Sequence, residues 1–120
     1  MRADMLTSIL TELNGTSADI EASGIISKDG LMMASVLPAG LDEDRVGAMS
    51  AAMLSLGDRT AQELVRGALE QVLIKGDQGY VLMTYAGEEA VLTVMAKPNS
   101  KLGLIFLDVK RAATSVSELI

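Results

Sequence analysis

Apolar residues along this chain follow two periods, one typical of helices and the other typical of strands. Near the start, in the long middle segment and near the end they recur at intervals of three and four residues, which predicts amphipathic helices. Short runs rich in Val, Ile and Leu lie between these segments and predict strands. The predicted elements are helices over 2–14, 42–67 and 100–120 and strands over 20–27, 31–37, 69–75, 80–85 and 90–96.

Short turns connect the predicted strands. Asp29-Gly30 joins the first two, and Gly76-Asp77-Gln78-Gly79 joins the third and the fourth. Connections of this length cannot cross over a sheet, so the strands should pair antiparallel. Strands 80–85 and 90–96 are almost continuously apolar, whereas a strand with one wet face would alternate. The sequence therefore predicts an α+β fold in which helices cover both faces of a largely antiparallel sheet. We find no internal repeat or linker and expect one domain over 1–120.

The long middle helix carries more apolar surface than one sheet requires. A narrow stripe is predicted to cover the sheet, and it consists of Val46, Met49, Met53, Leu56, Thr60 and Leu64. The rest of the first half should then be charged, yet residues 46–57 contain no charged side chain and many small ones. Two glycines inside a helix also indicate close backbone approach. Either a symmetry mate or another protein packs against this helix, or a loop or neighbouring helix of the same domain buries it.

Composition narrows the possible functions. Hydrophobic residues make up 49% of the chain, and with only three aromatic residues the core must come from aliphatic side chains and eight methionines. The net charge of −6 and the scattered basic residues argue against nucleic acid as a partner. With no Cys and no His, a thiol nucleophile or a Ser–His pair is impossible. We therefore expect no enzymatic activity and no cofactor.

The sequence also bears on location. The first residues reach Asp4 without the apolar core of a signal peptide, and no apolar run approaches the ~20 residues that span a bilayer. We expect a cytoplasmic protein that does not insert into a membrane.

Three groups of charged residues are candidates for chemistry. The acidic run at 42–44 falls where Asp42 would cap the long helix, and Glu88-Glu89 falls in a turn, so each position explains its own charge. Paired carboxylates could instead carry acid–base or cation chemistry. Arg59 and Arg66 either contact an acidic partner or belong to a solvated face.

Several segments, in order, resemble the roadblock superfamily of dynein-light-chain-like proteins, particularly its prokaryotic branch. The likeness spans nearly the whole chain. The segments are Gly24-Ile25-Ile26-Ser27-Lys28-Asp29-Gly30, Leu37-Pro38-Ala39-Gly40, Leu54-Ser55-Leu56-Gly57-Asp58-Arg59, Leu69-Glu70-Gln71-Val72-Leu73-Ile74, Gly79-Tyr80-Val81-Leu82, and Leu102-Gly103-Leu104 with Arg111-Ala112-Ala113.

This resemblance implies a sheet with the long helix on one face and the first and last helices on the other. It implies a homodimer in which the third strands pair into one continuous sheet and bring the long helices together. The expected interface on the long helix is Ala48, Ala51, Ala52, Ser55, Arg59, Gln62 and Arg66, and on the strand it is Leu69, Gln71, Leu73 and Lys75. Prokaryotic members typically partner Ras-like small GTPases, which implies a regulatory signalling role.

The leading interpretation is thus a non-catalytic homodimer that binds a Ras-like small GTPase, with an effect on the GTPase cycle left open. The chain stops at Ile120, without the C-terminal extension seen in a gliding-motility regulator of this branch, and this narrows the expectation from activation to binding. The alternative is a structural dimerisation or scaffold adaptor within a larger complex that leaves GTP hydrolysis unchanged.

Overall fold

A computed structural model describes residues 2–120, so that of the expected domain over 1–120 only Met1 lies outside the described residues. The chain forms three helices and five strands in the predicted order, which confirms the expected α+β fold. Their bounds are α1 Arg2–Thr16, β1 Ile20–Ser27, β2 Met32–Val36, α2 Glu43–Glu63, β3 Gln71–Gly76, β4 Gly79–Ala86, β5 Ala90–Ala96 and α3 Leu102–Ser117.

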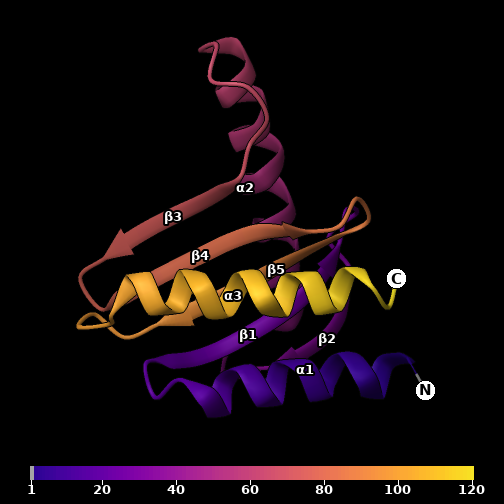
Figure 1. Cartoon of the computed structure of the whole chain (residues 1–120), viewed down its shortest axis with the longest axis vertical. Coiled ribbons are helices and arrows are strands. Elements are labelled where there is room, and N and C mark those ends of the chain that lie inside the picture. Colours follow the sequence, from indigo (N-terminus) through magenta and orange to yellow (C-terminus); the bar gives the residue numbers. More distant parts are fainter. Residues whose placement is uncertain (1) are drawn as a thin grey trace.

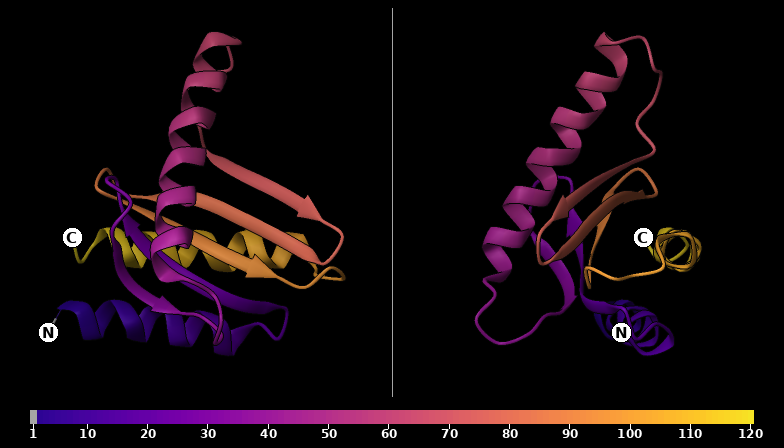
Figure 2. Two further views of the ribbon diagram at one scale, coloured as in Figure 1. Left: turned by 180° about the vertical axis from the view of Figure 1, so that it is seen from behind. Right: turned by 90° about the vertical axis from the view of Figure 1, so that its left-hand side faces the viewer.

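The strands form one antiparallel sheet in the order β2-β1-β5-β4-β3. Helices α1 and α3 lie side by side on one face, and α2 crosses the other face (Figures 1 and 2). This arrangement of three layers is the one that the resemblance implied. The last strand in the order, β3, has a neighbour on one side only, so one edge of the sheet is open there.

Two apolar cores hold the layers together. The larger core lies between the sheet and the pair α1 and α3, and Leu10, Leu92 and Val116 are fully buried in it. The smaller core lies under α2, around Ile26, Leu54 and neighbouring residues of β4 and β5. Burial on both faces explains why β5 shows no alternation of apolar and polar residues.

The helix ends differ in part from the prediction. Asp42 caps α2 as expected, because its Oδ1 accepts a hydrogen bond from the Asp44 amide at 2.9 Å. The last helix begins after Lys101, whose side chain makes no capping bond, and neither Asn99 nor Ser100 caps it. Among residues 2–120 no helix has the length and apolar content needed to cross a membrane.

Candidate interaction surface

The second half of α2 extends beyond the edge of the sheet. In the left view of Figure 2 the helix crosses in front of the strands and continues past β3, and the chain then returns to the start of that strand. The side chains of this projecting part are mostly exposed, including Leu56, Leu64 and Val65. A long stretch of helix therefore has almost no support from its own chain.

The stripe predicted to cover the sheet is wrong in four of its six positions, and one of them is the exposed Thr60. Met49, Leu56 and Leu64 are 60%, 58% and 64% exposed. The buried residues of α2 are instead Val46, Gly47, Ser50 and Leu54. The face that contacts the sheet thus includes Gly47 and Ser50, which hydrophobicity alone does not select.

The side of α2 that is buried is the one on which its backbone comes close to the turn between β1 and β2. A β-carbon at Gly47 would overlap the carbonyl oxygen of Gly30, which itself has a positive φ of 87° in the turn between β1 and β2. One turn later, the Thr93 hydroxyl on β5 donates a hydrogen bond of 2.7 Å to the Ser50 hydroxyl, and both side chains are buried. Small and hydroxyl-bearing residues therefore form the contact, and the larger side chains point elsewhere.

One flank of α2 keeps its large apolar side chains exposed. Met49 and Leu56 are seven residues apart and so share this flank. On the buried face, Gly57 lies against Val72 of β3, since an added β-carbon would come within 3.0 Å of the Val72 side chain. The exposure of Met49 and Leu56 differs from the prediction, and the uncharged stretch at 46–57 was the signal that could have revealed it.

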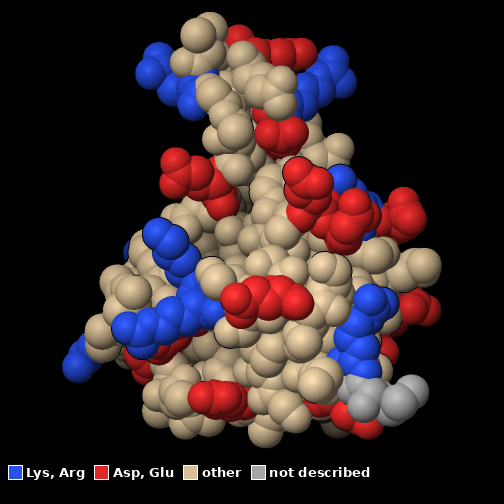
Figure 3. All heavy atoms as spheres, turned by 45° about the vertical axis from the view of Figure 1, so that its right-hand side comes forward, with Lys and Arg blue, Asp and Glu red and all other residues tan. Residues whose placement is uncertain are grey.

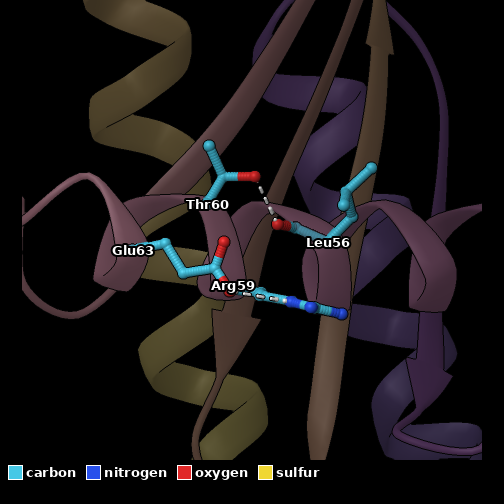
Figure 4. A network of polar contacts seen from close by, with 4 residues as sticks. All are labelled: Leu56, Arg59, Thr60 and Glu63. Carbon is cyan, nitrogen blue, oxygen red and sulfur yellow. Dashed lines mark hydrogen bonds and ion pairs between the residues drawn. The ribbon is translucent and has the colours of Figure 1, made fainter.

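The residues expected on the long-helix interface lie on α2, except for Arg66, which follows the end of the helix at Glu63. Ala48, Ala52, Ser55, Arg59, Gln62 and Arg66 are exposed, and Ala51 is half-buried. Arg59 Nε donates to Glu63 Oε1 at 3.1 Å, and one turn of helix is further tied by the Thr60 hydroxyl, which donates to the Leu56 carbonyl at 2.8 Å (Figure 4). Both partners of the ion pair are exposed, so it contributes little to stability.

The expected interface strand is present, but it starts later than predicted. Gln71, Leu73 and Lys75 lie in β3 and are exposed. Leu69 precedes the strand and is half-buried against the smaller core, so that residue does not belong to the strand. Ile74, which the sequence analysis did not single out, is 38% exposed.

A groove of about 400 Å³ separates the projecting part of α2 from the start of β3, and we call it the α2 groove. Its lining is almost entirely apolar. The lining residues are Met53, Leu56, Gly57, Thr60, Ala61, Leu64, Arg66, Leu69, Gln71 and Val72.

The end of α2 adopts an unusual backbone conformation. Val65 has a φ of 58°, in the left-handed region, and it is the one described residue other than glycine with a positive φ. The Val65 amide donates to the Gln62 carbonyl and the Arg66 amide to the Ala61 carbonyl at 2.7 Å, which is the Schellman pattern of helix termination. Glycine is the usual residue at this position, and Val65 is 84% exposed.

The acidic clusters have local explanations. The first cluster contains the cap residue Asp42, and the neighbouring Glu43 accepts a hydrogen bond from the Ser35 hydroxyl of β2. Glu88 and Glu89 are exposed in the turn between β4 and β5. Residues 2–120 contain no group of three or more His, Cys, Asp or Glu side chains that could hold a metal ion. The arrangement is suited to binding another macromolecule through apolar and small side chains.

The fold and its open edge define a three-layer α+β domain with an exposed long helix. The family is also clear, because residues 6–96 match the model of the Roadblock/LC7 domain, and the chain belongs to that family. It is 42% identical over 115 residues to the uncharacterised protein MJ0310 of Methanocaldococcus jannaschii, and the match covers 96% of this chain and 99% of that protein.

Solved structures share the fold at low sequence identity. MglB of Myxococcus xanthus has a TM-score of 0.88 at 17% identity, with 96% of this chain and 94% of that chain covered. A structure described as MglB with tetrameric arrangement has a TM-score of 0.89 at 19% identity, with 98% and 89% covered. These similarities confirm the roadblock fold that the sequence segments indicated.

Proposed function

We propose that this protein is a non-catalytic, cytoplasmic homodimer that binds a Ras-like small GTPase on the outward side of its paired α2 helices. The observation that carries the proposal is the projecting half of α2, whose apolar side chains find no cover in the same chain. We also propose that the whole chain acts as one domain.

The dimer would form along the open edge of β3. An edge strand leaves backbone N–H and C=O groups without partners, and a second copy of the same strand can satisfy them. An antiparallel pair with a two-fold axis near Leu73 would place Gln71 of each copy opposite Lys75 of the other. The projecting part of α2 would then lie over the sheet of the second copy.

The same pairing would fill the α2 groove. Val72 faces α2, and Ile74 shares its face because side chains alternate along a strand. In the proposed dimer, Ile74 of each copy enters the α2 groove of the other, and the two Met49 and Leu56 flanks face each other. Burial of apolar side chains that are exposed in one chain would supply the free energy of association.

The outward side of the paired helices would remain free for a partner. In each copy it carries Ala48 and Ser55, flanked by Arg59, and this mixture of small and basic side chains permits close approach by a protein surface. Family membership supports a small GTPase as that partner, since this is the role that the resemblance to prokaryotic roadblock proteins implied.

The test is calorimetric titration with each small GTPase encoded beside this gene, loaded with GDP or with a non-hydrolysable GTP analogue. We expect binding in at least one nucleotide state, and we expect Arg59→Glu to weaken it by about tenfold, because a charge of the wrong sign then faces the partner. Arg111→Glu makes the same change of charge at an exposed position on α3, so it is the matched control and should leave binding unchanged. Absence of binding in both nucleotide states would refute the GTPase partner.

Single-turnover GTP hydrolysis separates the two roles that remain. A faster rate on addition of this protein would establish regulation of the GTPase cycle. An unchanged rate with clear binding would establish the scaffold adaptor.

A further inference from the structure

A second groove lies on the opposite face of the sheet, between α3 and the ends of β3 and β4 that are nearest to it. We call it the α3 groove, and its volume is also about 400 Å³. The lining residues are Leu69, Glu70, Gln71, Thr84, Tyr85, Gly87, Phe106, Val109, Lys110, Ala113, Thr114 and Ser117. Leu69 and Gln71 also belong to the strand expected at the dimer edge, and the other ten lining residues take no part in the proposed function.

The α3 groove is a fixed feature of a single chain. The Thr84 hydroxyl on β4 donates to the Glu70 carbonyl at 2.9 Å, which ties the segment before β3 to the neighbouring strand. At the other end, Gly87 packs directly on Ser117 of α3, because an added β-carbon would lie 3.1 Å from the Ser117 side chain. The groove therefore needs neither the dimer nor the GTPase in order to exist.

The floor of the α3 groove is apolar. Phe106 is half-buried on the flank of α3 that points toward β3, and Val109 and Ala113 continue that flank along the helix. Phe106 is the one phenylalanine of the chain. Such a floor favours an apolar side chain as its occupant.

The rim of the groove is acidic. Glu70 lines it, Glu88 and Glu89 follow the lining residue Gly87, and Glu118 follows Ser117. Asp58 is also close, since its Oδ1 accepts a hydrogen bond from the amide of Leu69 at 3.4 Å.

Few basic groups oppose these carboxylates. Lys110 is the one basic residue in the lining. Figure 3 shows acidic side chains gathered where the projecting end of α2 meets the body of the molecule. Burial, with a smaller effect of the Asp58 carboxylate, raises the pKa of the Tyr85 hydroxyl above its ordinary value, so that tyrosine adds no charge at neutral pH.

We propose that the α3 groove is a docking site for a segment of another protein that presents an apolar side chain flanked by lysine or arginine. The apolar side chain would rest on Phe106 and Val109, and the basic groups would meet Glu70 and the carboxylates beside Gly87 and Ser117. The groove and the proposed GTPase surface lie on opposite faces of the sheet, so both partners could be held at once. This gives the protein the means to connect a GTPase to a second component.

The probe is a fluorescein-labelled peptide of about twelve residues, in which leucines recur at intervals of three and four and lysines lie between them. It is compared with a peptide that carries glutamate in place of lysine. Anisotropy titration of the full chain should show binding of the lysine peptide alone. We expect weaker binding at higher ionic strength, because the rim carboxylates are exposed to solvent.

Variants locate the binding. Thr114→Trp fills the groove from an exposed position and should lower the affinity by about tenfold, and Glu70→Lys combined with Glu88→Lys should do the same. The matched control combines Glu12→Lys with Glu21→Lys, which makes the same change of charge away from the groove, and should change the affinity less than about twofold. Thermal unfolding and sedimentation of each variant establish that it is folded.

Three outcomes would overturn this inference. The lysine peptide does not bind, or it binds the groove variants and the control variant alike, which would indicate attraction to net charge only. In the third, Thr114→Trp alters the mass of the unliganded protein, which would show that a second copy of this chain occupies the groove. GTPase binding is measured in a separate titration, so a failure of the proposed function can be distinguished from a failure of the α3 groove proposal.

Discussion

Val65 occupies a backbone conformation that helix ends usually reserve for glycine. A left-handed conformation brings the β-carbon close to the following carbonyl oxygen, and branching at that carbon increases the strain. Contacts of the Val65 side chain within the same chain do not offset this strain, because the side chain is 84% exposed.

Val65→Gly should therefore raise the free energy of unfolding by about 1 kcal/mol. Urea denaturation at fixed protein concentration measures the change. Arg66→Gly alters the next residue, whose φ is not positive, and should give no increase. A less stable Val65→Gly protein would mean that the side chain has a stabilising contact in the dimer that outweighs the strain.

The hydroxyl pair between Ser50 and Thr93 is a buried contact between two polar side chains where α2 meets β5. Thr93→Val alone should destabilise the protein by about 1–3 kcal/mol, because the Ser50 hydroxyl is left buried without its donor. The double variant Ser50→Ala with Thr93→Val should cost less than the sum of the two single changes. A double-mutant cycle from urea denaturation tests this, and strict additivity would show that the pair is not coupled.

At the scale of elements, α2 and β3 carry the surfaces that one chain leaves uncovered. Leu56→Glu, and likewise Ala52→Glu, should shift the protein toward monomer, since each places a charge in the proposed contact between helices. Sedimentation velocity at several concentrations measures the shift. Leu104→Glu provides a matched control, because Leu104 is 59% exposed and Leu56 is 58% exposed. An unchanged dimer in both α2 variants would place the interface elsewhere.

The elements themselves were predictable, because periodicity and turn residues such as Asp29-Gly30 act locally. The rotation of α2 about its axis was not. Hydrophobicity ranks Met49 and Leu56 above Gly47 and Ser50, so the pattern assigned the larger residues to the sheet. The structure assigns the smaller ones, because the helix approaches Gly30 too closely for larger side chains.

The candidate site was predictable to a similar degree. The uncharged stretch at 46–57 predicted a contact surface, which stays a prediction; within it Ala48, Ala52 and Ser55 are exposed and Ala51 is half-buried. The predicted start of β3 was two residues early. Leu69 packs against Gly57 of α2, and no pattern within the strand itself reveals that contact. The α3 groove joins residues from 69 to 117, and no local pattern reveals it.

At the scale of the whole molecule, the absence of cysteine allows the proposed dimer to be tested by cross-linking. Leu73→Cys places one thiol near the proposed two-fold axis, where it would meet its own copy. We expect a disulfide-linked dimer under mild oxidation, measured by non-reducing electrophoresis. Leu31→Cys, in the exposed turn between β1 and β2, is the control and should cross-link far less. Equal cross-linking of the two variants would contradict the pairing of β3.

The strand order also governs when the proposed edge can exist during synthesis. β5 lies between β1 and β4, so the hairpin of β3 and β4 joins the rest of the sheet only through residues 90–96. A growing chain that has passed β4 but not β5 has two separate hairpins and no complete sheet. Because the nascent chain lacks the complete sheet that supports the β3 edge, we expect no dimerisation between two chains that are still being synthesised on one messenger. The dimer should therefore assemble from released, folded chains, and its formation should depend on their concentration in the cell.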